Sequence, residues 1–143
     1  MAAPSRIKVL IVDDHPLLRA GVAALLKQER DIQIVGESDN GKDALKRVKE
    51  LAPDVVLIDI TMPGMDGIEA TTQIVKSGSA AKVLVLTQHE HEEYIKRIMR
   101  CGAKGYILKS SVGDELIKGI RAVHTGDQFF TAEVSKIMVE SYV

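Results

Sequence analysis

Apolar residues gather in five short runs along the chain, separated by longer stretches of mixed polarity. The runs lie at residues 7–12, 32–35, 55–58, 83–86 and 106–108. They are rich in β-branched residues and apolar at both alternating positions, which is typical of strands covered on both faces. The pattern therefore predicts five buried strands of a parallel sheet.

Each run is followed by a segment whose apolar residues recur at helical spacing. Leu18, Val22 and Leu26 share one face of the first segment, where Pro16 suits the first helical turn. Asp66 is the expected N-cap of the third helix. The other stripes comprise Ala44, Leu45, Val48 and Leu51, then Ile68, Ala70, Ile74 and Val75, then Ile95, Ile98 and Met99, then Val112, Leu116, Ile117, Ile120 and Val123. Five successive βα units predict a doubly wound α/β domain, with helices on both faces and right-handed crossovers.

This pattern divides the chain into three parts. We expect a flexible tail at residues 1–6, the α/β domain at residues 7–126, and a C-terminal linker helix within residues 127–143. No apolar run reaches the roughly 18 residues that a membrane span needs, so no membrane partner is expected.

Composition narrows the function classes. The 143 residues carry a formal net charge of −1, which argues against a generic nucleic-acid or membrane-surface binder. Cys101 is the only cysteine, which excludes an internal disulfide framework and a cysteine-based zinc site. A reducing, cytoplasmic setting is the expected one.

Charged and hydroxyl side chains follow four of the predicted strands. Asp13 and Asp14 follow the first, Asp59 the third, Thr87 the fourth and Lys109 the fifth. In a doubly wound sheet, ligands bind outside the carboxyl ends of the strands. Clustered carboxylates repel one another, and a Mg²⁺ ion that joins them to a phosphate resolves the conflict. Asp59, alone at the tip of a buried strand, is the candidate nucleophile for an aspartyl phosphate.

Each of these residues has an ordinary structural interpretation when taken alone. An Asp-Asp pair after a strand often caps a helix, a single aspartate often forms a turn, and a lysine after an apolar run is usually solvated. Their joint occurrence at the ends of strands one, three, four and five favours the functional interpretation.

Four motifs resemble the receiver domain of two-component response regulators. They are VLIVDD at residues 9–14, DVVLIDITMPGMDG at 54–67, LVLT at 84–87 and GAKGYILK at 102–109. The resemblance covers residues 7–126. It implies a flavodoxin-like or CheY-like sheet of five parallel strands in the order 2-1-3-4-5, with an extra C-terminal helix.

The resemblance also implies roles for the polar residues. Asp59 corresponds to the phosphorylated aspartate, and Asp14 to the acidic residue that binds Mg²⁺ or Mn²⁺ directly. Asp13 corresponds to its neighbour that acts through water, and Thr61 to the position that offers its main-chain carbonyl to the metal.

The remaining implied roles concern signalling. Thr87 corresponds to the switch hydroxyl, Lys109 to the lysine that pairs with the phosphoryl group, and Tyr106 to the switch aromatic, whose burial changes as Thr87 moves. Two positions depart from the common pattern: Ser110 stands where many receivers have a cis proline, and Gln88 where a small residue is frequent.

The segments GAKGYILKS and GDQFFTAEV resemble the NarL/FixJ subfamily. Such regulators receive their phosphoryl group from a sensor histidine kinase, dimerise on phosphorylation, and bind DNA through a LuxR-type helix-turn-helix domain. That domain does not lie within residues 1–143, so we expect DNA binding only through a domain outside them. A stand-alone CheY-like receiver that acts through protein binding is the alternative. A phosphatase or phosphotransfer enzyme is disfavoured because Thr61 stands where such enzymes carry a second aspartate.

The four histidines, His15, His89, His91 and His124, do not have the spacing of a metal cluster. His15 follows the acidic pair at the expected start of the first helix. We predict a surface or capping role for it.

Overall fold

The computed structural model describes residues 5–62, 64–88, 92–130, 136 and 139–140. Strands and helices alternate along the chain as predicted. The strands are β1 (Ile7–Val12), β2 (Ile32–Ser38), β3 (Val55–Asp59), β4 (Lys82–Thr87), β5 (Gly105–Leu108) and β6 (Phe129–Phe130). The helices are α1 (Pro16–Lys27), α2 (Gly41–Leu51), α3 (Gly67–Lys76), α4 (Glu92–Arg100) and α5 (Asp114–His124), with a 3-10 turn at Lys109–Ser111.

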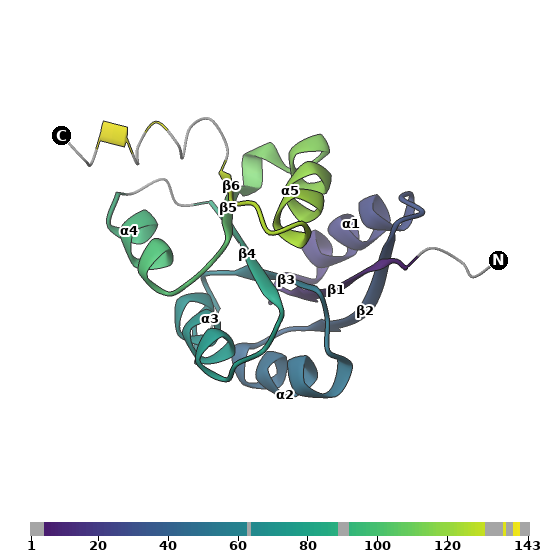
Figure 1. Cartoon of the computed structure of the whole chain (residues 1–143), viewed down its shortest axis with the longest axis horizontal. Coiled ribbons are helices and arrows are strands. Elements are labelled where there is room, and N and C mark those ends of the chain that lie inside the picture. The colour runs from purple at the N-terminus through teal and green to yellow at the C-terminus, as the bar shows by residue number, and fades with distance from the viewer. Residues whose placement is uncertain (1–4, 63, 89–91, 131–135, 137–138, 141–143) are drawn as a thin grey trace.

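The sheet is parallel throughout its described pairs and has the order β2-β1-β3-β4-β5-β6. Helices α1 and α5 cover one face, and α2, α3 and α4 cover the other (Figure 1). The predicted doubly wound fold and its strand order 2-1-3-4-5 are confirmed, and β6 extends the sheet beyond β5.

Two apolar clusters, one on each face of the sheet, form the core. On β1, Leu10 and Val12 join the cluster under α2, α3 and α4, whereas Val9 and Ile11 join the cluster under α1 and α5. Because successive side chains of a strand point to opposite faces, a sheet buried on both sides requires apolar residues at every position. The continuous apolar runs of the sequence therefore have their cause in this three-layer arrangement.

Predicted helix boundaries agree with the structure at several positions. Pro16 is the first residue of α1, and the Asp66 side chain caps α3 by accepting a hydrogen bond from the Glu69 N–H at 2.8 Å. Gly102 and Gly126 follow α4 and α5 with φ of 95° and 98°, a left-handed conformation that glycine adopts without steric cost.

The C-terminal part of the chain begins with a short strand that was not predicted. Phe129 and Phe130, ahead of the expected linker helix, form β6, which pairs with Gly105 and Tyr106 of β5. The cause is apolar burial at the sheet edge, since Phe130 packs against the cluster on one face and Phe129 against the cluster on the other. Beyond β6, only residues 136, 139 and 140 are described, and they are helical; the rest of the expected helix lies outside the described residues.

The described helices were checked for a segment that could span a membrane, since the sequence predicts none. Within the described part of the chain, no helix has both the length and the apolar character needed to cross a bilayer.

Candidate functional site

The predicted site residues meet at the carboxyl edge of the sheet. Asp13 and Asp14 follow β1, Asp59 ends β3, Thr87 ends β4, and Lys109 follows β5. Parallel strands bring these positions to one edge, as the sequence predicted. Asp13 and Asp59 are each 2% exposed and Thr87 is fully buried, so these polar groups lie within the fold and not on its solvated rim.

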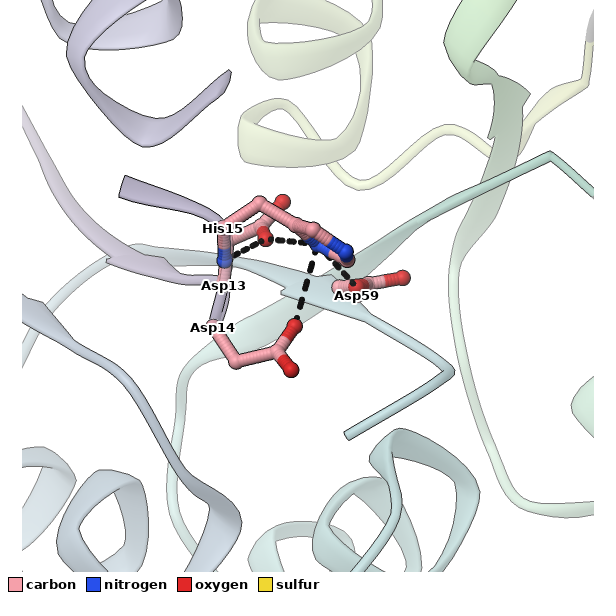
Figure 2. Close-up of side chains that lie close together, drawn as sticks. All are labelled: Asp13, Asp14, His15 and Asp59. Atoms are coloured by element: carbon pink, nitrogen blue, oxygen red, sulfur yellow. Dashed lines mark hydrogen bonds and ion pairs between the residues drawn. The ribbon is translucent and has the colours of Figure 1, made fainter. Parts of the chain in front are cut away.

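The acidic side chains converge, and His15 joins them (Figure 2). One ligand atom from each of Asp13, Asp14, His15 and Asp59 lies within 4.8 Å of all the others. His15 Nδ1 is 3.0 Å from Asp13 Oδ1, 3.0 Å from Asp14 Oδ1 and 3.6 Å from Asp59 Oδ2. The cluster thus combines three carboxylates and one imidazole.

Lys109 supplies a positive charge beside the same Asp59 oxygen that His15 approaches. Its Nζ lies 3.2 Å from Asp59 Oδ2 and 3.8 Å from Asp13 Oδ2. Burial raises the pKa of the Asp59 carboxyl; the Lys109 ammonium opposes this rise and the Asp13 carboxylate adds to it. Lysine therefore offsets only part of the cost of holding a carboxylate at this buried position.

The loop after β3 is shaped to present Asp59. The Thr61 N–H lies 3.3 Å from Asp59 Oδ1 and donates to it, and the Gly67 N–H donates to the Ile60 carbonyl at 2.8 Å. A Cβ atom on Gly67 would collide with the main-chain carbonyl oxygen of Asp59. The start of α3 thus lies so close to the backbone of the candidate nucleophile that only glycine fits at position 67.

The loop after β1 is held from two directions. The Arg19 guanidinium donates to the Asp13 carbonyl at 2.6 Å and to Glu37 at 3.1 Å, which ties α1 to β2 through the acidic loop. The His15 N–H donates to Asp13 Oδ1 at 2.8 Å. These contacts fix the direction in which the Asp13 carboxylate points.

The donor set fits a hard divalent cation. Asp14 Oδ1 and Asp59 Oδ2 are both buried and accept no hydrogen bond of good geometry within the described residues. Buried acceptors without such a partner are costly, and a cation bound between them removes the cost. Carboxylate oxygens in this number suit Mg²⁺ or Mn²⁺, which take oxygen ligands and retain several waters.

Two other predicted residues lie deeper in the fold. Thr87 and Tyr106 are fully buried, and Tyr106 belongs to the apolar cluster that contains Ile95 and Ile98 of α4. The peptide bond that joins Lys109 to Ser110 is trans. Tyr106, near the start of β5, therefore lies on the face of the sheet that α4 covers.

The histidines divide into three cases. His15 occupies the N-cap position of α1, but its side chain makes no capping hydrogen bond and lies among the carboxylates instead. His124 is exposed at the end of α5, and His89 and His91 lie outside the described residues. The spacing of the histidines along the chain does not indicate this position of His15, because its ring joins two aspartates adjacent to it and one on β3.

The sequence matches the family described as response regulator receiver domain over residues 9–121. The chain belongs to this family. The predicted relationship to receiver domains, and to response regulators of the NarL and LuxR type, is confirmed.

Individual relatives agree with this assignment. Response regulator GacA of Pseudomonas aeruginosa is 41% identical over 130 residues, which are 91% of this chain and 61% of GacA. A LuxR-family response regulator from Aurantimonas sp. SI85-9A1 superposes with a TM-score of 0.91 at 32% identity, covering 96% of this chain and 99% of that structure. RcsB of Salmonella enterica serovar Typhimurium, bound to promoter DNA in the presence of the phosphomimetic BeF₃⁻, superposes with a TM-score of 0.86 at 25% identity, covering 95% of this chain and 68% of that structure. The chain spans about three fifths of the length of GacA.

Proposed function

We propose that this receiver domain accepts a phosphoryl group on Asp59 from a sensor histidine kinase, with Mg²⁺ or Mn²⁺ bound in the acidic cluster. The modification then controls an effector domain outside residues 1–143. The observation that carries the proposal is the environment of Asp59. Its carboxylate is buried at the end of β3, faces Lys109 at 3.2 Å, and has one oxygen without a well-formed hydrogen bond among the described residues.

The proposed transfer is an in-line displacement. An oxygen of the Asp59 carboxylate forms a bond to phosphorus while the bond between phosphorus and the histidine nitrogen of the kinase breaks. The electron pair of that bond stays on the nitrogen, and the product is an acyl phosphate on Asp59.

The charges around Asp59 suit the phosphoryl group that would arrive. Lys109 Nζ lies within ion-pair distance of Asp59 and can pair with a phosphoryl oxygen. We propose Asp14 and Asp59 as direct metal ligands, the Thr61 carbonyl as a main-chain ligand, and Asp13 as a ligand through water. When bound, the metal would neutralise charge on the phosphoryl oxygens.

Thr87 and Tyr106 are proposed to carry the signal away from Asp59. Thr87 ends the strand next to Asp59, and its hydroxyl is suited to bond a phosphoryl oxygen. Tyr106 lies on the neighbouring strand β5, opposite Val85, in the apolar cluster that includes α4 residues. Phosphorylation would thus change the surface formed by α4, β5 and α5 through a two-state rearrangement of these two side chains.

The effector is proposed to be a LuxR-type helix-turn-helix domain that regulates transcription. Support comes from the RcsB relative bound to promoter DNA, and from the additional length of GacA beyond the matched region. Residues 127–143 would lead from the receiver toward that domain. Dimerisation on phosphorylation, a cytoplasmic setting and a signalling role without turnover of a substrate belong to the same proposal.

Intact-mass spectrometry tests the phosphorylation. The protein is incubated with acetyl phosphate and Mg²⁺, alongside Asp59→Ala and, as a matched control, Asp127→Ala, which removes an exposed carboxylate. The parent and Asp127→Ala should gain one phosphoryl group, whereas Asp59→Ala should gain none. An adduct that persists in Asp59→Ala would overturn the assignment of the acceptor.

A further inference from the structure

The imidazole of His15 lies in the proposed metal site, a position that the phosphorylation chemistry does not use. Its Nδ1 faces Asp13, Asp14 and Asp59 at once, at 3.0, 3.0 and 3.6 Å (Figure 2). Because its backbone N–H donates to Asp13 Oδ1 at 2.8 Å, the residue is anchored to the same carboxylate that its ring approaches.

Hydrogen bonding cannot satisfy all three of these contacts. A ring nitrogen offers one proton or one lone pair, so Nδ1 can donate to a single carboxylate oxygen. It lies at the same 3.0 Å distance from oxygens of Asp13 and Asp14. Asp14 Oδ1 and Asp59 Oδ2 nevertheless accept no well-formed hydrogen bond among the described residues.

The separations match those of neighbouring ligands around one cation. In octahedral coordination with bonds of about 2.1 Å, adjacent ligand atoms are about 3 Å apart. The distance from His15 Nδ1 to Asp14, one of the two proposed direct carboxylate ligands, has this value. The distance to Asp59, the other, is longer at 3.6 Å, and the contact with Asp13 is a hydrogen bond at 3.0 Å. Moreover, the ring is 58% exposed, so it can meet a cation from the solvent side while the buried Asp59 meets it from within.

We propose that His15 is a nitrogen ligand of the metal in this receiver. The site would then bind Mn²⁺ more tightly than Mg²⁺, and Ni²⁺ or Zn²⁺ more tightly still. The difference in affinity from Mg²⁺ would be larger than at a site with oxygen ligands alone. Imidazole suits these transition ions, whereas Mg²⁺ prefers oxygen. The inference rests on the metal site of the proposed function and adds to it a ligand and a metal preference.

Electron spin-echo envelope modulation on the Mn²⁺-loaded protein tests the coordination directly. The parent should show modulation from a directly bound ¹⁴N nucleus. The modulation should vanish in His15→Phe, which keeps an aromatic ring but removes both nitrogens. His124→Phe is the matched control, because it removes an exposed histidine at the far end of α5, and it should retain the signal.

Affinities measured by titration give the second readout. His15→Phe should weaken Mn²⁺ and Ni²⁺ binding by about tenfold and change Mg²⁺ binding much less. Metal binding without ¹⁴N modulation, or an equal loss for all three ions, would overturn the role of His15 and leave the carboxylate site standing. If the folded parent bound neither Mn²⁺ nor Mg²⁺, the metal site of the proposed function would fall as well.

Discussion

Lys109 Nζ lies 3.2 Å from Asp59 Oδ2, although Asp59 ends β3, Lys109 follows β5, and β4 lies between these two strands. The lysine side chain therefore reaches across the carboxyl end of β4 to the carboxylate on β3. The same ammonium is 3.8 Å from Asp13, so one cation serves two buried carboxylates. Removing it should affect metal binding and phosphoryl transfer in opposite directions.

Lys109→Met keeps most of the side-chain length and removes the charge. Mg²⁺ affinity should rise by about threefold to tenfold, because a competing cation has left the acidic cluster. Phosphorylation by acetyl phosphate should slow by at least about tenfold, because the transferred group loses a counter-charge. Isothermal titration and intact-mass time courses measure the two effects. Lys104→Met, at an exposed position, should change neither, and a fall in Mg²⁺ affinity in Lys109→Met would contradict the argument.

Asp59→Asn should stabilise the metal-free protein. Burial raises the pKa of Asp59 in the folded state, so ionisation of this group costs folding free energy at neutral pH. The pKa of Asp59 is higher in the folded protein than in the unfolded protein, so on acidification the folded protein binds the proton first. The parent protein therefore gains stability as the pH falls toward the raised pKa. At about pH 7 and without metal, the melting temperature of Asp59→Asn should exceed that of the parent by about 2–4 °C.

The difference in melting temperature between Asp59→Asn and the parent should shrink on acidification and on addition of Mg²⁺. Acid protonates Asp59 in the parent, and Mg²⁺ stabilises the parent more than the variant by mass action. Differential scanning calorimetry with EDTA and with Mg²⁺ measures both. An Asp59→Asn protein that melts below the parent in EDTA would show that the Lys109 pair outweighs the cost of burial.

The sequence predicted the fold well because its signals were redundant. On β1, Val9, Leu10, Ile11 and Val12 are each required to be apolar by one of the two covered faces. The meeting of Asp13, Asp14, Asp59, Thr87 and Lys109 followed from parallel topology, which places strand ends at one edge. The prediction of the buried strands and the prediction of the shared sheet edge can both be made without knowing how any side chain is oriented.

Features that depend on side-chain orientation or on short pairings were not predicted. β6 has two residues, too few for a periodic signal, and it forms because Phe129 and Phe130 gain burial at the edge of β5. The position of the His15 ring depends on its rotamer and on a carboxylate 44 positions away. Spacing along the chain contains no information on either.

Gly67→Ala should perturb the phosphorylation loop. An added Cβ would meet the Asp59 carbonyl oxygen and the Cα of Ile60, so the start of α3 must move away from β3. We expect a loss of about 1–3 kcal/mol in the free energy of unfolding, together with slower phosphorylation of Asp59. Urea denaturation and intact-mass time courses measure these changes.

Gly21→Ala is the matched control for that substitution. Gly21 lies within α1, is exposed, and has no atom within 4 Å of an added Cβ. Alanine there should stabilise the protein by about 0.5–1 kcal/mol, because helical glycine is entropically costly. Equal effects of Gly67→Ala and Gly21→Ala would refute the close approach as the cause.

Arg121 joins α5 to the loop between α1 and β2. Its guanidinium donates to Asp31 and Glu29 at 2.9 Å, and this hydrogen bonding lowers the pKa of Asp31. The contribution to stability is therefore present above the ordinary pKa of aspartate and is lost as pH falls through the lowered folded value. Because Arg121 and Asp31 are about half exposed and Glu29 is 28% exposed, Arg121→Ala should cost no more than about 1 kcal/mol at about pH 7.

Two conditions should reduce the cost of Arg121→Ala. About 1 M NaCl screens the exposed charges, and acidification to about pH 2 protonates the carboxylates. Urea denaturation of Arg121→Ala and the parent under each condition gives the difference. Lys46→Ala serves as the control, because it breaks a looser exposed pair, with Lys46 Nζ 3.9 Å from Glu50, and should cost less than Arg121→Ala. A cost that is independent of both salt and pH would mean that the Arg121 stem contributes by apolar packing and not by its charge.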